Sequence, residues 1–172
     1  AMAVSTGGAM TIFGDVVADH RIDVTAGGAV DLKGTMRAVD AMDISVGGAF
    51  TVSGSLEGAG SVNLTAGGAV TQKDDGRFVS IGTMTLSSVG GQLLLGDNNV
   101  AALETDNRGG GTVKFNNAYD GLTLRGVRQH DGGGIEVTND GALSISGETW
   151  TTSDDIIITN DGDVVMSEVV RT

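Results

Sequence analysis

One stretch of the chain gathers residue types that hydrolytic chemistry uses. The segment Arg125-Gly126-Val127-Arg128-Gln129-His130-Asp131 holds two cations, an imidazole and a carboxylate. Enzymes that hydrolyse or cleave polysaccharides place such acids and bases on one outer face. They also need paired carboxylates in equivalent positions, and the pair Asp74-Asp75 is expected about three coils from this stretch. We therefore predict a solvated corner here, no catalytic residue, and a chain that is not an enzyme.

Metal and phosphate chemistry have weaker candidates. Asp23 and Asp43 hold equivalent positions of a sequence repeat, and calcium could bridge two such carboxylates. The glycine-and-aspartate nonapeptide of calcium-binding β-rolls is absent, so a hydrated acidic face is predicted. His20 and His130 have no zinc-ligand spacing, and Gly109-Gly110-Gly111 lacks the lysine of a phosphate loop. We predict no metal site and no cofactor.

Two aromatic residues and one repeated motif are further candidates for ligand binding. Trp150 and Tyr119 could form a sugar platform, but each is isolated in sequence and is predicted to cover a corner or an end. The tripeptide Asn139-Asp140-Gly141 recurs as Asn160-Asp161-Gly162. Because these residue types tolerate positive φ, the tripeptides are predicted to form stacked corners.

Composition and charge limit the fold and the partners. The 172 residues include 29 glycines, which disfavour helix, while 40% hydrophobic content argues against disorder. The net charge of −12 would repel nucleic acid and anionic membranes. No apolar run approaches the roughly 20 residues that span a bilayer. The start, Ala1-Met2-Ala3, leads us to expect a piece excised from a longer protein.

A short repeat organises the first half of the chain. The tripeptide Gly-Gly-Ala occurs at 7–9, 27–29, 47–49 and 67–69, and alternating apolar residues flank it on both sides. That alternation is typical of half-buried strands. A third short run places Val16, Met36 and Leu56 in register. Three strands and two glycine corners predict one triangular coil, on which the next coil stacks about 4.8 Å away.

The second half keeps apolar pairs at looser spacing. We assign Met84/Leu86 and Val113/Phe115 to the column of first strands, so that coils start at positions 2, 22, 42, 62, 84, 113, 135 and 156. Residues 1–83 are thus predicted to form regular coils, and 84–172 less regular ones with an insertion around 96–111. The chain as a whole is predicted to be a single all-β domain, a right-handed parallel β-helix of about eight triangular coils of roughly 20–22 residues. The remaining pairs are assigned as Ile135/Val137 and Ile156/Ile158 in the first column, and as Leu93/Leu95, Leu122/Leu124, Leu143/Ile145 and Val164/Met166 in the second.

The regular rows resemble a known family. The segments 22–34 and 42–54 share the pattern Ile/Val-x-Val/Ile-x-Ala-Gly-Gly-Ala-Val-x-Leu-x-Gly, with small variations. This pattern resembles the haemagglutinin-type repeats of large bacterial exoproteins, such as filamentous haemagglutinin-like adhesins exported by two-partner secretion. Residues 2–72 match it best, and 84–170 match it more weakly. The resemblance implies a right-handed β-helical shaft, secreted and displayed at the bacterial cell surface, with flanking β-helix coils of the same parent chain as partners.

Three functions remain open. The chain is predicted to be a structural shaft, an adhesive segment that binds a host-cell receptor or glycan, or both. The alternative is a carbohydrate-binding or polysaccharide-degrading β-helix protein. An insertion could protrude and carry a binding surface, or it could only shield a change in coil cross-section. The binding residues predicted in it are Asn98, Asn99, Glu104, Asp106, Asn107 and Arg108.

Overall fold

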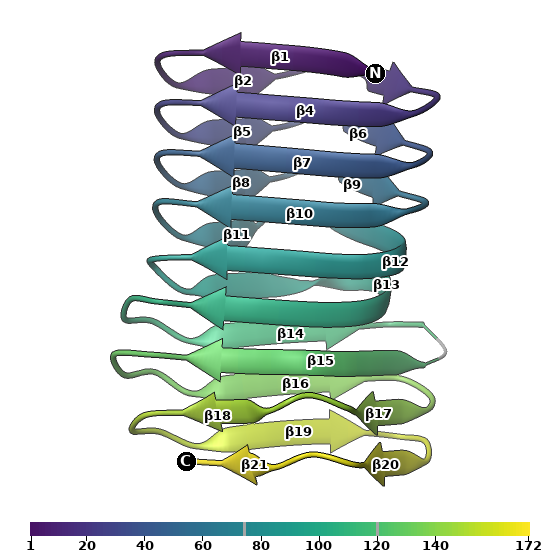
Figure 1. The fold of residues 1–172 in the computed structure, drawn as a ribbon, viewed down its shortest axis with the longest axis vertical. Helices are drawn as coiled ribbons and strands as arrows, with labels where there is room; N and C mark the ends of the chain where they lie inside the picture. The colour runs from purple at the N-terminus through teal and green to yellow at the C-terminus, as the bar shows by residue number, and fades with distance from the viewer. Residues whose placement is uncertain (74, 120) are drawn as a thin grey trace.

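The computed structural model describes residues 1–73, 75–119 and 121–172, and every regular element in these ranges is a β-strand. The strands wind into a right-handed solenoid whose coils stack from the N-terminus to the C-terminus (Figure 1). Neighbouring coils pair in parallel throughout. The predicted all-β parallel β-helix of about eight coils is therefore confirmed. No helix in the described ranges is long and apolar enough to cross a membrane.

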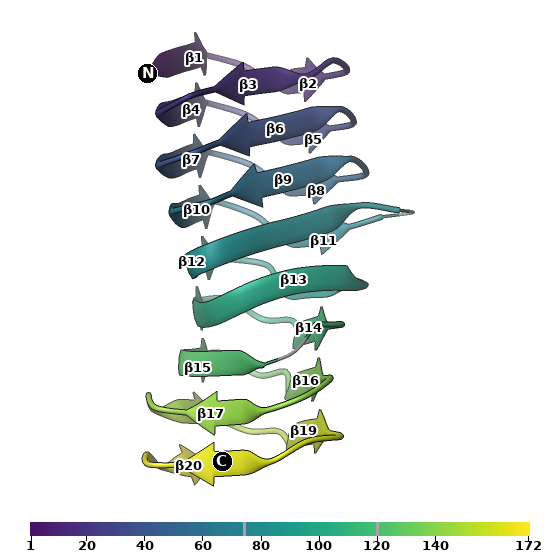
Figure 2. The same ribbon diagram turned by 90° about the vertical axis from the view of Figure 1, so that its right-hand side faces the viewer.

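Three strands make up each of the first coils, and we refer to them as the first, second and third strand of a coil. In Figure 2 the third strands of the first coils face the viewer. The strands of the first three coils are β1 (Met2–Thr6), β2 (Met10–Ile12), β3 (Val16–Ala18), β4 (Arg21–Ala26), β5 (Val30–Leu32), β6 (Thr35–Ala38), β7 (Ala41–Val46), β8 (Phe50–Val52) and β9 (Ser55–Gly58).

Two later strands, β12 and β13, are longer because each continues from a third strand into the next first strand. The strands of the later coils are β10 (Ser61–Ala66), β11 (Val70–Gln72), β12 (Arg77–Ser88), β13 (Gln92–Asn107), β14 (Val113–Asn117), β15 (Leu122–Gln129), β16 (Ile135–Asn139), β17 (Leu143–Ile145), β18 (Thr149–Thr151), β19 (Ile156–Asn160), β20 (Val164–Met166) and β21 (Val170–Arg171).

Apolar side chains at alternate strand positions fill the inside of the solenoid. In β4 the inward residues Ile22 and Val24 are buried, while Asp23 and Thr25 face outward. Val24 pairs with Ile44 of the next coil, and Ile44 pairs with Leu64, which confirms the predicted apolar ladder. Burial of each such side chain stabilises the fold by about 1.5–3 kcal/mol. In the first four coils the core is thus a column of stacked, nearly identical layers.

The glycine corners let the backbones of successive coils touch. The amide of Gly47 donates to the carbonyl of Ala26 at 2.8 Å, and the amide of Gly48 donates to the carbonyl of Gly28 at 3.1 Å. A Cβ atom on Gly47 would lie 2.4 Å from the carbonyl oxygen of Gly27, which is backbone and cannot move aside easily. Space, and not an unusual φ, therefore explains glycine at this position.

We expect Gly47→Ala to lower the free energy of unfolding by about 1–3 kcal/mol, because the new methyl group must separate two hydrogen-bonded coils. Gly7 is the matched control, since it occupies the same corner in the first coil and a Cβ atom there meets nothing within 4 Å. Gly7→Ala should change stability by no more than about 0.5 kcal/mol. Urea denaturation of both variants measures the difference, and equal losses would contradict this account of the corner.

The predicted insertion does not exist, and the column assignment of the second half was wrong. Met84 pairs with Leu103, whereas Val113 pairs with Gln92 as a second strand. Residues 96–107 lie in β13, which supplies a second strand, a third strand and the next first strand in one run. The predicted interval of 29 residues between the coil starts at 84 and 113 was too long, because Val113 begins the second strand β14 and not a first strand. Leu122, Leu143 and Val164 likewise share one column in a different position from the one predicted.

The column assignment of the second half is wrong because polar side chains occupy inward positions of β13. Gln92, Asn98, Thr105 and Asn107 are all buried, so the apolar pairs that marked the columns earlier are incomplete here. The cross-section changes in the same region. The first strand, 6 residues long in β10, is divided in a later coil into β17 and β18 of 3 residues each. Second strands lengthen from 3 residues in β8 to 5 in β16.

Buried amides stack at the corner that follows the second strands in the second half. The Nδ2 atom of Asn117 donates to Oδ1 of Asn139 at 2.9 Å, and Nδ2 of Asn139 donates to Oδ1 of Asn160 at 2.7 Å. Gly141, which closely follows Asn139, has a φ of 88°. The prediction that Asn-Asp-Gly forms stacked corners in register is therefore confirmed. A hydrogen-bonded ladder of this kind can fix the register of coils where apolar pairs no longer do.

Candidate binding surface

The predicted binding residues divide into an inner and an outer group. Asn98 and Asn107 are fully buried, so their predicted exposure is wrong. The remaining four residues keep outward positions, but on or beside strand β13 of the regular stack and not on a protrusion. They are Asn99, Glu104, Asp106 and Arg108.

The two buried asparagines hydrogen-bond to backbone and side-chain groups of neighbouring coils. Oδ1 of Asn98 accepts from the amide of Phe78 at 2.9 Å, and Nδ2 of Asn98 donates to the carbonyl of Asn116 at 2.9 Å. Oδ1 of Asn107 accepts from Oγ of Ser88 at 2.8 Å, and its Nδ2 donates to Oε1 of Gln129 at 2.7 Å. Both side chains are thus structural and unavailable to a ligand.

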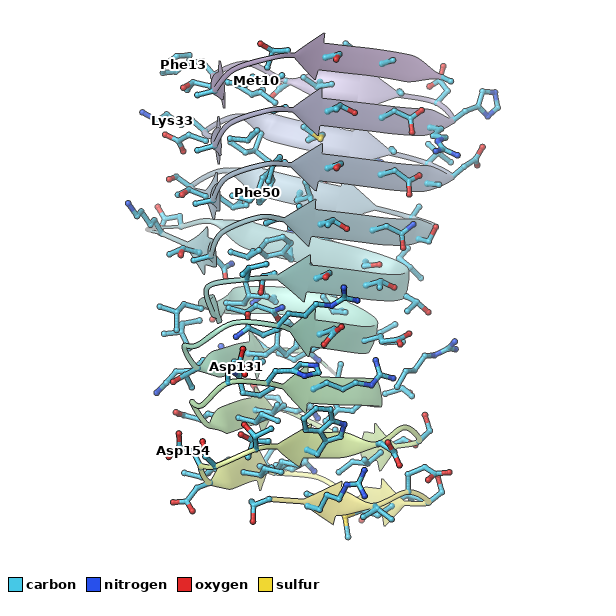
Figure 3. All side chains as sticks on the ribbon, turned by 60° about the vertical axis from the view of Figure 1, so that its left-hand side comes forward. Met10, Phe13, Lys33, Phe50, Asp131 and Asp154 are labelled. Carbon is cyan, nitrogen blue, oxygen red and sulfur yellow. The ribbon has the colours of Figure 1, made fainter. Side chains whose placement is uncertain are left out.

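Three of the outer residues, Glu104, Asp106 and Arg108, belong to a group that draws on three coils. We define the polar-aromatic cluster as Glu104, Asp106, Arg108, Arg128, His130 and Trp150. Pairing of β13 with β15 sets Asp106 beside Arg128, and pairing of β15 with β18 sets Arg128 beside Trp150. The cluster therefore lies on the outer face of the first strands, next to the corner where Figure 3 labels Asp131.

Asp106 is the centre of the charged contacts in the cluster. Its Oδ1 lies 2.8 Å from Nε2 of His130, and its Oδ2 accepts a hydrogen bond from Nε of Arg108 at 2.8 Å. Partial burial alone would raise the pKa of this carboxyl, but the hydrogen bonds and charges of Arg108 and His130 outweigh it and hold the pKa below its ordinary value. The side chain therefore stays ionised at neutral pH and can only accept hydrogen bonds.

The aromatic part of the cluster packs against its imidazole. The rings of His130 and Trp150 meet edge to face, with centroids 4.7 Å apart. Trp150 is half-buried, and it lies on a strand face and not at an end or a corner as predicted. Arg128 completes the group, since its Nη1 lies 3.3 Å from Oε1 of Glu104. The cluster thus offers an aromatic surface beside charged donors and acceptors that are held in place.

The sequence predicts Glu104, Asp106 and Arg108 of this cluster as binding residues, but it does not predict how the cluster assembles. The stretch 125–131 contains Arg128 and His130, whereas Trp150 stands isolated in the sequence. The signal that joins them is the sequence interval from Arg128 to Trp150, which is one coil of this part of the solenoid. That interval could be recognised only with the correct column assignment.

The paired aspartates of the first half have a simple explanation. The guanidinium of Arg21 lies between them, with Nε 2.6 Å from Oδ1 of Asp23 and Nη2 3.1 Å from Oδ2 of Asp43. Asn63 adds a hydrogen bond from Nδ2 to Oδ1 of Asp43 at 2.8 Å. An arginine thus offsets the repulsion for which a bridging metal ion was considered. In the described ranges, no group of three or more His, Cys, Asp or Glu side chains is arranged to hold a metal ion.

Comparison with protein-family models, with curated proteins and with solved structures gives no match for this chain. Support for a function therefore comes from the sequence pattern, the fold and the outer surface alone.

Proposed function

We propose that this chain is a structural shaft with an adhesive site, part of a secreted bacterial exoprotein displayed at the cell surface. The polar-aromatic cluster is the proposed contact with a host-cell receptor or glycan. The resemblance of residues 2–72 to haemagglutinin-type repeats supports the shaft, and the parallel solenoid is compatible with it.

One observation carries the adhesive part of the proposal. A single outward column runs along the first strands from end to end, and its composition changes abruptly at β13. Coils before β13 place only small hydroxyl side chains in it, and coils from β13 on place large charged and aromatic ones. The column reads Ser5, Thr25, Ser45, Thr65, Ser87, Asp106, Arg128, Trp150 and Arg171.

Large planar groups suit recognition because they bury much area, and an aromatic side chain such as Trp150 also loses little conformational entropy. Tryptophan and arginine are enriched among the residues that dominate binding energies. A sugar ring can pack on the indole of Trp150 while its hydroxyls meet Glu104 and Arg128. The low pKa of Asp106 suits this role better than catalysis, since the general acid of a glycoside hydrolase needs a raised pKa.

Flanking coils of the same parent chain are the other proposed partners. Val164 and Met166 continue inward columns of the solenoid, yet their exposed fractions are 50% and 64%. A further coil stacked on β20 would cover both side chains. Such a contact would extend the shaft by the same parallel pairing that joins the described coils.

We expect Trp150→Ala to weaken binding to glycans or to host cells about tenfold or more, because the aromatic surface is lost. Thr65→Ala, in the same column on the regular part of the shaft, is the matched control and should leave binding unchanged. Binding can be measured on a glycan array and on cultured cells, with circular dichroism to confirm that both variants fold. If the wild-type chain binds neither, or if Trp150→Ala binds as well as wild type, the adhesive role is refuted.

A further inference from the structure

The third strands of the first four coils form a second outer face with an unusual arrangement of charges. It consists of β3, β6, β9 and the first part of β12, which lie side by side in Figure 2. Two outward columns cross it, and we refer to their residues as the third-strand face. In order of coils, one column is Asp15, Thr35, Ser55 and Arg77, and the other is Val17, Arg37, Glu57 and Val79.

Each column is complementary to itself when its order is reversed. The first column has an acid, Asp15, at one end and a base, Arg77, at the other, with two hydroxyl side chains between them. The second column has valine at both ends and the pair Arg37 and Glu57 in the middle. Reversal therefore brings Asp15 opposite Arg77, Arg37 opposite Glu57, and Val17 opposite Val79.

The charged side chains of this face are available for such contacts. In the part of the chain that the structure describes, none of the four forms an ion pair, whereas Arg21, Arg108 and Arg128 all do. Glu57 accepts one hydrogen bond, from Oγ of Ser55 at 2.8 Å. Charges of both signs on one face that form no ion pair with the described residues indicate a partner with the same pattern in reverse.

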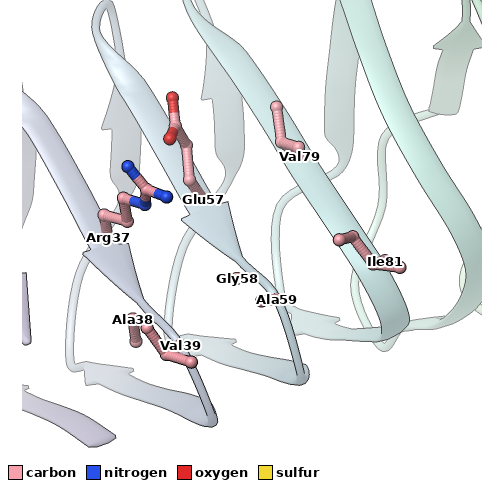
Figure 4. A pocket seen from close by; sticks show the side chains of 8 residues that line it. All are labelled: Arg37, Ala38, Val39, Glu57, Gly58, Ala59, Val79 and Ile81. Atoms are coloured by element: carbon pink, nitrogen blue, oxygen red, sulfur yellow. The ribbon is translucent and has the colours of Figure 1, made fainter. Parts of the chain in front are cut away.

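Apolar surface borders these charges. Val17 is 61% exposed and Ile81 is 72% exposed, although both are β-branched hydrophobic residues. A shallow pocket of about 120 Å³ lies between the second and fourth coils, with Ala38, Gly58 and Ala59 at its base and Arg37 and Glu57 on its rim (Figure 4). The face thus combines a small apolar recess with projecting apolar side chains.

We propose that two copies of this chain associate through their third-strand faces, with their solenoid axes antiparallel. A two-fold axis in the interface, perpendicular to the solenoid axis and level with the gap between β6 and β9, produces this arrangement. It sets Arg37 of each copy against Glu57 of the other, Asp15 against Arg77, and Val17 against Val79. A two-fold interface requires such a self-complementary patch, in which residue i meets residue j and j meets i.

The size of the face sets the expected strength of association. Four coils stacked about 4.8 Å apart give a patch below the area of a standard stable interface. The dimer is therefore weak, with a dissociation constant in the micromolar to millimolar range, and it weakens as salt screens the intermolecular ion pairs.

Charge reversal tests the pairing of Arg37 with Glu57. Sedimentation velocity over the micromolar to millimolar range should show a monomer–dimer equilibrium for the wild type. Arg37→Glu alone and Glu57→Arg alone should each raise the dissociation constant about tenfold or more, because like charges then face each other. The double variant Arg37→Glu/Glu57→Arg restores both pairs within the same two-fold arrangement, so it should return the constant to near the wild-type value.

Further variants separate this interface from other modes of association. Ile81→Asp should weaken the dimer, and Met166→Asp, at the last coil, should not. Thermal melts by circular dichroism confirm that each variant is folded, as expected for exposed positions. A monomer at every concentration overturns the proposal, and so does a dimer that Met166→Asp abolishes or that the single charge reversals leave intact.

Discussion

Ile44→Asp should lower the free energy of unfolding by at least about 4 kcal/mol, because it places a carboxylate in the dry apolar ladder. Ile44 is 2% exposed, and it packs between Val24 and Leu64 of the adjacent coils. Both neighbours in that ladder are apolar and offer the new carboxylate no hydrogen bond. The loss is a large fraction of the roughly 5–15 kcal/mol by which domains are usually stable, so urea denaturation should show a much lower midpoint or an unfolded chain.

The adjacent residue provides the control. Asp43 faces outward, where Arg21 and Asn63 contact it, and Asp43→Asn keeps the shape of the side chain while removing its charge. We expect a loss of no more than about 1 kcal/mol, as for other surface ion pairs. Equal midpoints for the two variants would show that the inward and outward positions of β7 are wrongly assigned.

The second large effect is expected from Asn107→Leu. Leucine is of similar size, but it cannot replace the contacts that Asn107 makes to Ser88, to the amide of Gly91 and to Gln129. Each of those buried groups then lacks its partner, which costs about 1–3 kcal/mol per group. We expect a total loss of about 3 kcal/mol or more, because the network is shared between coils.

Asn99→Leu is the matched control for this variant. Asn99 lies on the same strand but faces outward and is only half-buried, so its replacement should change stability by no more than about 0.5 kcal/mol. Both free energies of unfolding can be measured by urea titration. If the two variants were equally stable, the buried amide network would not contribute to the fold, and the explanation given for β13 would fail.

The sequence was sufficient to predict the fold and the regular half of the stack. Alternating apolar residues around Gly-Gly-Ala identified the inward residues Val24, Ile44 and Leu64. The alternation and the 20-residue repeat predict the same pairing of neighbouring coils there. The Asn139-Asp140-Gly141 corner was also predictable, since its residue types tolerate the backbone that a corner requires.

The candidate site could not be predicted as fully. In β13 the inward positions carry Asn98 and Asn107, whose burial depends on hydrogen bonds to distant residues that no local pattern reveals. Polar residues in series suggested a solvent-exposed loop, which is the usual meaning of such composition. Without the correct column assignment of β13, Trp150 could not be predicted to lie beside Arg128, because their proximity depends on the length of the coil between them.

Paired residues of the first four coils are 20 residues apart in sequence, so recombination between coils can change the length of the solenoid. Met2 pairs with Ile22, and Ile22 pairs with Met42, so loss of residues 21–40 would leave each remaining column in register and shorten the stack by one coil. Duplication of the same unit would lengthen it. The later coils offer no such unit, since their steps vary and their amides interlock. Gene rearrangement can therefore change how far the polar-aromatic cluster stands from the other end without altering the cluster itself.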